Sequence, residues 1–348
     1  MRIFRLLLYP LSLVYNLITA IRNLLFNLKI KKIHYSGTPI ICIGNLSAGG
    51  TGKTPHTEFC IRLLSPNNKI TVLSRGYNRL TSGYILAHEK SNANEIGDEP
   101  FQFYNKFSDI KVAVDEKRVR GIRNIIQDHQ PDVIILDDAF QHRYVKPHFS
   151  ILLTDYNELF TEDFVLPAGN LRENRFNAKR ADLVIVTKSP RKLDLLKKKE
   201  IREDIQSYTK AKVLFSSINY CPLKTLNGEN VSEEFELNKF DHIVAVTGIA
   251  KSTGFIQALH KYGNTIRQYK FADHYRYSES DIDDIISNFN RIETNSKAIF
   301  TTEKDAMRLL EFKDKLQNIP VYYWPIEIDM NDKDKNILKT ALLGVVNV

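Results

Sequence analysis

The chain has 348 residues, of which 43 % are hydrophobic and 26 % charged; this excludes wholesale disorder and suggests two domains at about 150 residues each. Its three cysteines, Cys42, Cys60 and Cys221, fit neither a disulfide framework nor a zinc-binding spacing, which favours a reducing cytosolic compartment. The net charge of +8 predicts an anionic partner, and since the sequence has no zinc finger, RNP-like motif or Arg-rich arm, we do not expect nucleic acid.

The first predicted element is an amphipathic helix within residues 1–30. Its polar side chains share one stripe of a helix: Arg2, Arg5, Ser12, Asn16, Thr19, Asn23 and Asn27. Apolar side chains share the opposite side: Ile3, Leu7, Leu11, Val14, Ile18, Ile21 and Leu25. We expect the helix to lie in a membrane interface, with Lys29, Lys31 and Lys32 near anionic headgroups. Two alternatives for this helix stay open: it could pack on the protein's own core, or it could span the membrane. The uncharged stretch is, however, shorter than the about 20 residues that a span needs.

Short apolar runs alternate with helical segments along the rest of the first half. Residues 38–44 predict a buried strand, after which a glycine-rich turn leads into a helix from about Thr54. Further strands are expected at Ile70–Leu73, Val112–Val114, Val133–Leu136, Ile151–Leu153 and Leu183–Val186. This alternation predicts an α/β fold with a mainly parallel sheet. The highly charged segment 188–210 is interpreted as a helix with a solvated face.

The pattern restarts after about Ala211, which indicates a domain junction. The run VLFSSINY predicts a strand near that junction. Further strands are expected at Ile243–Val246, Ala298–Phe300 and Val321–Trp324. We therefore predict a first unit over residues 31–212 and a smaller second α/β unit over residues 213–348.

A glycine-rich loop between the first strand and its helix predicts a phosphate-binding site. The loop comprises Ser47, Ala48, Gly49, Gly50, Thr51, Gly52, Lys53 and Thr54. Its N–H groups would cradle phosphate oxygens, Lys53 would reach the β- and γ-phosphates, and Thr54 would hold Mg²⁺. Ser47 stands where the strict Walker A pattern has glycine, so an accidental surface turn is the alternative. The flanking strand and helix favour a P-loop NTPase-like domain.

Asp137 and Asp138 end the apolar run 133–136. A Walker B carboxylate occupies such a strand end and meets the metal of the phosphate-binding loop. A helix cap is the alternative interpretation of these aspartates.

Asp98, Glu99 and His274 are weaker candidates on spacing alone. Asp98 and Glu99 are adjacent carboxylates in a predicted loop, where they could supply a base or a metal ligand. His274 follows Asp273, and an acid beside a histidine can tune it for proton transfer. A lone histidine of this kind is more often structural.

Several short motifs occur together and in order. They are GNLSAGGTGKTP, LSRGYNR, GDEP, LDDAFQH, LPAGNLRE, FADHYRY and TTEKDAMR, preceded by the amphipathic N-terminus. Each motif alone is ambiguous, but the ordered set resembles the tetraacyldisaccharide 4'-kinase family from the first residues to about Arg308. Asn78 and Asn170 replace a glycine and a proline that are common in that family, which bears on loop conformation and leaves the implied chemistry unaltered.

The resemblance implies a kinase that uses ATP and Mg²⁺. Such an enzyme phosphorylates the 4'-hydroxyl of a tetraacylated glucosamine disaccharide 1-phosphate, a lipid A precursor, and forms lipid IVA at the cytoplasmic face of the inner membrane of a Gram-negative-type bacterium. Asp98 would serve as base with the help of His274 from the second unit. Metal or nucleotide roles are implied near Thr54, Glu99, Asp137 and Asp138. Further candidate positions are Arg75, Arg118, His142, Arg172 and Glu173.

Two other functions are consistent with parts of the sequence. A P-loop GTPase or ATPase switch would need no lipid acceptor, but residues 187–190, TKSP, lack the aspartate by which the NKxD motif reads guanine. A non-catalytic membrane-bound scaffold would leave the phosphate-binding loop, the paired carboxylates and His274 without a purpose. The acyl-chain lengths of the acceptor and the oligomeric state stay open.

Overall fold

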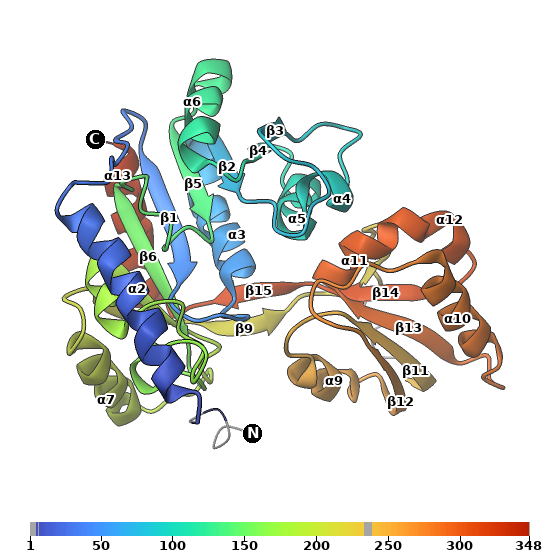
Figure 1. The fold of residues 1–348 in the computed structure, drawn as a ribbon. Helices are drawn as coiled ribbons and strands as arrows, with labels where there is room; N and C mark the ends of the chain where they lie inside the picture. Colours follow the sequence, from blue (N-terminus) through green and yellow to red (C-terminus); the bar gives the residue numbers. More distant parts are fainter. Residues whose placement is uncertain (1–4, 6, 233–238, 348) are drawn as a thin grey trace.

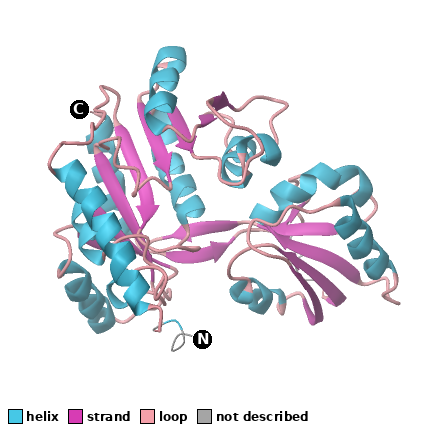
Figure 2. Cartoon of the chain, viewed as in Figure 1, coloured by secondary structure: helices cyan, strands magenta, loops and turns pink. Residues whose placement is uncertain are grey.

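The computed structural model describes residues 5, 7–232 and 239–347, so the positions predicted for Arg2 and Ile3 lie outside the described residues. The described residues form two α/β units, each built on its own sheet, and a two-stranded ribbon between them (Figures 1 and 2). Both sheets are mainly parallel and are flanked by helices, which confirms the predicted fold class.

The larger sheet belongs to the first unit. Its strands are Ile40–Asn45 (β1), Ile70–Ser74 (β2), Ile85–Leu86 (β3), Lys111–Val114 (β4), Val133–Asp137 (β5), Phe149–Asp155 (β6), Leu183–Thr187 (β7) and Lys212–Phe215 (β8). Their order is β3-β4-β2-β5-β1-β6-β7-β8, and β3 alone among these described strands runs antiparallel to its neighbour. β1 lies inside the sheet, between β5 and β6. The glycine-rich loop therefore leaves the sheet from its middle, at the C-terminal edge where α/β proteins build their sites.

Helices cover both faces of the larger sheet. They are Tyr9–Asn27 (α2), Lys53–Leu64 (α3), Ala93–Ile96 (α4), Asp98–Lys106 (α5), Arg118–His129 (α6), Leu195–Gln206 (α7) and Asp332–Val346 (α13), with 3₁₀ turns at Ser65–Asn67, Phe160–Glu162 and Arg175–Arg180. Alternate side chains of β1 point to opposite faces. Ile41 and Ile43 pack in the core with α3 and α13, whereas Ile40 and Cys42 pack in the core with α6. Burial on both faces explains why these strands are continuous apolar runs in the sequence.

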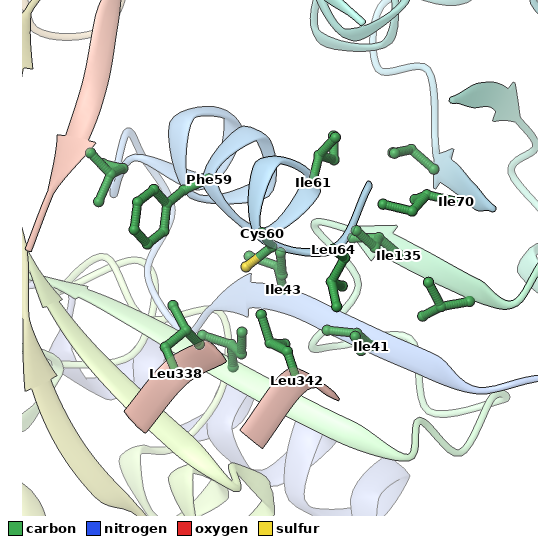
Figure 3. Packing of buried hydrophobic residues seen from close by; sticks show 14 of the residues in the cluster. Ile41, Ile43, Phe59, Cys60, Ile61, Leu64, Ile70, Ile135, Leu338 and Leu342 are labelled. Atoms are coloured by element: carbon green, nitrogen blue, oxygen red, sulfur yellow. The ribbon is translucent and has the colours of Figure 1, made fainter. Parts of the chain in front are cut away.

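The C-terminal helix α13 completes the core of the first unit (Figure 3). Leu338 and Leu342 are fully buried there, in one cluster with Cys60 of α3 and Ile43 of β1. Burying a leucine of this kind stabilises the fold by roughly 1.5–3 kcal/mol. Residues 213–348 are predicted from the sequence to form the second unit, whereas in the structure β8 is an edge strand of the larger sheet and α13 packs on that sheet. The physical reason is that Leu338 and Leu342, one helical turn apart, form an apolar stripe that the larger sheet covers.

The smaller sheet belongs to the second unit. Its strands are Lys224–Thr225 (β10), Phe240–Thr247 (β11), Gly263–Lys270 (β12), Lys297–Thr302 (β13) and Val321–Trp324 (β14), in the order β10-β14-β13-β11-β12. Its helices are Thr253–Leu259 (α9), Glu279–Asn290 (α10), Glu303–Leu309 (α11) and Lys313–Leu316 (α12), with a 3₁₀ turn at Leu310–Phe312. The strand β12 is not among the strands predicted from the sequence. This strand lies at a sheet edge with mostly exposed side chains, so it lacks the apolar run that marks a buried strand.

A strand ribbon and a contact between helices both join the two units. β9 (Ser217–Tyr220) and β15 (Ile326–Asp329) pair antiparallel and form the connecting ribbon (Figure 1). A second contact joins α4 and α5 to α11, where Ile96 and Phe101 pack with Ala306 and Met307. Residues that lie at the start of α5 therefore face the second unit directly.

Helix α2 packs on the first unit through its polar stripe. Ser12 and Asn23 are buried. Ser12 Oγ accepts a hydrogen bond from the backbone N–H of Ala168 at 2.9 Å, and Asn23 Nδ2 donates to Glu173 Oε2 at 2.9 Å. The stripe that is polar in the sequence is thus the side that holds the helix to the protein.

The apolar stripe of α2 faces outward. Val14 and Ile18 are 58 % and 61 % exposed. Large apolar side chains continue this exposed surface along the helix and beyond both of its ends: Leu7, Leu8, Leu11, Leu13, Leu17, Ile21, Leu24, Leu28 and Ile30. An apolar patch of this extent on a surface marks an interaction site. In the described part of the chain, no helix combines the length and the apolar character needed to cross a membrane.

Candidate active site

The glycine-rich loop turns directly into α3. Gly49 and Gly52 have φ values of 129° and 84°, which side chains with a Cβ rarely adopt. Gly52 is the residue before Lys53, the first residue of α3. The N–H groups of a helix N-terminus have no intrahelical acceptors, so this loop and helix form a site suited to phosphate.

The end of β7 holds the loop from one side. Thr187 Oγ1 donates a hydrogen bond to the carbonyl oxygen of Thr51 at 2.9 Å, and Lys188 Nζ donates to that of Gly50 at 2.5 Å. Lys188 also forms an ion pair with Asp155 at 2.7 Å. Across a trans peptide the C=O and N–H groups point in opposite directions. Holding the two carbonyls against β7 therefore turns the adjoining N–H groups away from it.

Asp138 lies beside the loop lysine. Its Oδ2 is 3.6 Å from Lys53 Nζ, and its Oδ1 accepts a hydrogen bond from Arg172 Nη1 at 3.1 Å. Burial alone would raise the pKa of Asp138, but Lys53 and Arg172 more than offset this, so the pKa is lowered. The three side chains form a paired, charged group next to the phosphate-binding loop.

Asp137 is fully buried at the end of β5. It accepts hydrogen bonds from Thr57 Oγ1 at 3.2 Å and Ser74 Oγ at 3.3 Å. Burial, followed by the charges of Asp138 and Glu99, raises the pKa of Asp137 to about 6. A divalent cation would relieve this repulsion, and carboxylate and hydroxyl oxygens are the ligands Mg²⁺ prefers. The residues present at this position therefore fit such a metal.

Asp98, the first residue of α5, is held by two side chains of the second unit. Its Oδ2 lies 3.0 Å from His274 Nδ1 and accepts from Arg308 Nε at 2.9 Å and Nη2 at 2.6 Å. Burial opposes ionisation, but the hydrogen bonds from His274 and Arg308 outweigh it and lower the pKa of Asp98 to about 2. The structure thus brings together Asp98 and His274, which lie far apart in the sequence.

Lys304 occupies the other side of His274. Its Nζ is 2.9 Å from His274 Nε2 and 2.9 Å from Glu99 Oε1. An ammonium can only donate, so Nε2 is the acceptor and the proton of a neutral ring lies on Nδ1, toward Asp98. Asp98, Glu99 and His274 offer ligand atoms within 4.8 Å of one another. In this arrangement the ammonium of Lys304 supplies the positive charge beside Glu99.

Three further predicted residues, Arg118, His142 and Arg75, lie within electrostatic reach of one another. Arg118 is buried and donates from Nη2 to the backbone carbonyl of Asp137 at 3.3 Å; burial lowers its pKa to about 10. Burial and the charges of Arg118, Arg75 and Arg22 lower the pKa of His142 to about 4, so this ring is neutral at pH 7. Arg75 is exposed but lies within electrostatic reach of both Arg118 and His142.

Glu173 has a different set of contacts from its neighbour Arg172. Its buried carboxylate accepts hydrogen bonds from Asn23 at 2.9 Å, from Gln141 at 3.1 Å and from Arg180. These contacts join α2 to the first unit. Arg172, one residue earlier, donates to Asp138, which pairs with Lys53. The adjacent residues Arg172 and Glu173 therefore connect α2 with the phosphate-binding loop.

Arg308 was given no role in the sequence analysis, although it is a direct partner of Asp98. Lys304 and Arg308 lie one helical turn apart on α11, directly after β13. Residues at i and i+4 share one face of a helix. In the sequence, the spacing of Lys304 and Arg308 just after a predicted strand indicates only that the two side chains share a helix face. The fold is needed to show that this face contacts α5.

The chain is similar to known proteins over nearly its whole length. A family model described as tetraacyldisaccharide-1-P 4'-kinase matches residues 4–346. The tetraacyldisaccharide 4'-kinase of Bacteroides thetaiotaomicron is 41 % identical over 97 % of this chain and 92 % of its own length; that of Flavobacterium psychrophilum is 44 % identical over 98 % and 97 %. The crystal structure of LpxK from Aquifex aeolicus in complex with ATP matches with a TM-score of 0.78 at 26 % identity, over 99 % of both chains. The chain therefore belongs to the tetraacyldisaccharide-1-P 4'-kinase family.

Proposed function

We propose that this protein is a lipid kinase that transfers the γ-phosphate of ATP to the 4'-hydroxyl of a tetraacyldisaccharide 1-phosphate, forming lipid IVA. The observation that carries the proposal is the contact of Asp98 with His274 across the two units, in a chain whose glycine-rich loop leads into α3. A nucleotide switch that hydrolyses ATP or GTP has no need of a base completed by a second unit. Family membership supports the same reaction.

The phosphate groups would be held by the loop at residues 47–54. Its N–H groups and the amino end of α3 would face the phosphate oxygens, and Lys53 would neutralise charge on the group being transferred. Thr54 and Asp137, with Asp138 beside them, would hold Mg²⁺. When bound, this ion would neutralise the negative charge that develops on the phosphate groups.

Asp98 would accept the proton of the acceptor hydroxyl. As the hydroxyl oxygen attacks the γ-phosphorus, its proton passes to the carboxylate of Asp98, and ADP leaves with the electrons of the broken bond. A carboxylate with a pKa of about 2 is ionised at pH 7 but only weakly basic. A loose, metaphosphate-like transition state needs little deprotonation of the nucleophile, so a weak but well-oriented base is sufficient.

The second unit would orient this base. His274 donates from Nδ1 to Asp98 and is itself fixed by Lys304, while Arg308 holds the same carboxylate oxygen with two N–H groups. The other carboxylate oxygen of Asp98 would then be the one to meet the acceptor. Under this proposal neither unit alone would have a functional base.

We also propose that α2 attaches the protein to the cytoplasmic face of the inner membrane. The support is the outward-facing apolar stripe around Val14 and Ile18, together with exposed Lys29 and Lys32 just after the helix. An interfacial helix of this kind would insert its apolar side among acyl chains, with basic residues at the headgroups. A lipid acceptor would then reach the active site without leaving the membrane surface.

A transfer assay tests the proposed reaction. Radiolabelled ATP is incubated with the protein and tetraacyldisaccharide 1-phosphate in detergent micelles, and the label is followed into lipid. Lys53→Ala should lower transfer by about 10²–10³-fold or more, because the transition-state charge loses a fixed counterion. Lys111→Ala, at an exposed position of β4, is the matched control and should be fully active. Acceptor-independent ATP consumption with no labelled lipid would favour the nucleotide switch instead.

A further inference from the structure

His56 of α3 makes two buried hydrogen bonds that the proposed reaction does not use. Its Nδ1 lies 2.7 Å from the carbonyl oxygen of Gly52, and its Nε2 lies 2.9 Å from Ser216 Oγ. The side chain is almost completely buried, and this burial lowers its pKa to about 4, so the ring is neutral. A carbonyl can only accept, so Nδ1 carries the proton and Nε2 accepts from the hydroxyl of Ser216.

The first of these bonds fixes the last peptide of the phosphate-binding loop. Gly52 has a φ of 84°, and its carbonyl already accepts the backbone N–H of His56 at 3.2 Å. The ring adds a second, shorter hydrogen bond to that carbonyl. The N–H of Lys53 belongs to the same peptide and points in the opposite direction, toward the position that phosphate would occupy. His56 therefore orients the N–H of Lys53, a donor of the phosphate site, by holding the carbonyl of Gly52 in the same peptide group.

The second bond reaches the point where the chain leaves the larger sheet. Ser216 lies between β8 and β9, so it directly precedes the connecting ribbon. Its backbone N–H donates to the carbonyl of Val186 at 3.0 Å, and its carbonyl accepts from the N–H of Ser189 at 2.8 Å. Ser216 is thus fixed to β7, and its hydroxyl is a firm anchor for the ring of His56.

We infer that His56 is a positioning residue that ties the phosphate-binding loop to the start of the connecting ribbon, and that this tie sets the affinity for the phosphates of ATP. The inference rests on the proposed binding of ATP. It goes beyond the proposed reaction because neither His56 nor Ser216 touches the substrate. We expect both hydrogen bonds to contribute to ATP affinity, because each holds one end of the same ring.

Variants of His56 and of Ser216 distinguish a role in positioning the loop from a role in the stability of the fold. His56→Phe keeps the ring volume and removes both hydrogen bonds, while His56→Asn keeps a donor near the position of Nδ1. Ser216→Ala removes the anchor. Ser189→Ala is the matched control, because it also removes a buried serine hydroxyl, one that donates to the carbonyl of Val186 at 3.0 Å and does not reach the loop.

The dissociation constant of a non-hydrolysable ATP analogue is measured by calorimetry, alongside the thermal midpoint of each variant. We expect about tenfold weaker binding for His56→Phe, since a buried carbonyl and hydroxyl each lose a partner. Ser216→Ala should weaken binding less, Ser189→Ala should not change it, and His56→Asn should recover part of the loss. The His56→Phe/Ser216→Ala double variant should bind within about twofold of His56→Phe, because the two groups act as a unit.

Wild-type affinity in a folded His56→Phe variant would overturn the inference, and so would losses that multiply in the double variant. If His56→Phe does not fold, Ser216→Ala and His56→Asn decide: wild-type affinity in both overturns the inference. Failure of the wild-type protein to bind the analogue would instead remove the proposed function, and the inference with it.

Discussion

The outward-facing stripe of α2 gives the most direct test of membrane attachment. We expect the double substitution Val14→Asp and Ile18→Asp to release the protein from membranes. Both side chains lie on the exposed side of the helix, so the substitutions place charge where apolar contact is proposed and leave the buried contacts of Ser12 and Asn23 in place.

The size of the effect follows from the exposed fractions of the two side chains. Val14 is 58 % and Ile18 is 61 % exposed, and burying a whole side chain of this kind is worth about 1.5–3 kcal/mol. Each residue therefore has roughly 1–2 kcal/mol to gain from a membrane. Losing both weakens binding by about 2–4 kcal/mol, which is about 30- to 1,000-fold in partition constant. The cost of placing aspartates in the interface adds to this loss.

The assay is co-sedimentation with vesicles that contain anionic phospholipid. The matched control is Leu195→Asp with Leu196→Asp on α7, which changes the charge equally at side chains that are 78 % and 76 % exposed. The control should bind as wild type does. Equal sedimentation of all three proteins would refute the assignment of α2 as the anchor, and an equal loss in both variants would show that net charge, and not the α2 surface, governs binding.

Three further predictions concern the chemistry. Asp98→Ala and His274→Ala should each lower turnover strongly while ATP still binds, and the double variant should be little worse than the worse single; multiplicative losses in turnover at saturating substrates would contradict a shared base. Arg308→Gln should raise the pKa of Asp98 from about 2, because a cation and two N–H donors are lost. As pH falls, activity should then be lost at a higher pH than in wild type, and an unmoved acid limb of the pH–rate profile would argue against Asp98 as the base. Chelation by EDTA should abolish transfer and added Mg²⁺ restore it; an unchanged rate would make Asp137 and Asp138 structural.

The sequence predicted the buried strands well because their side chains are covered on both faces. β1, β5 and β7 each contain a continuous apolar run, and such a run can be recognised without knowing which strands pair with it. The exposed edge strand β12 carries no such run and was missed. The return of α13 to the larger sheet was also missed, because an apolar stripe shows that a helix packs and does not show on which sheet.

The candidate site was predictable where its chemistry is local in the chain. The loop at residues 47–54 and the pair Asp137–Asp138 each form one short segment, so their residue types and spacing carry the information. Asp98 and His274 were weak candidates until the ordered motifs were considered together. Arg308 could not be assigned from the sequence, because its role depends on the contact of α11 with α5, which only tertiary structure creates.

The position of α13 affects how the chain folds during its synthesis. β9 and β15 lie side by side, so the second unit is an insertion whose two ends meet at Ser217 and Asp329. A ribosome synthesises the whole insertion before it makes Leu338 and Leu342, and until then the face of the larger sheet that α3 and α13 cover lacks the part contributed by α13. The nascent first unit would therefore carry exposed apolar surface for the duration of synthesis of the second, which is the interval in which a chaperone would be needed. Joining the ends of β9 and β15 by a short turn would remove the insertion and bring α13 to its place at once.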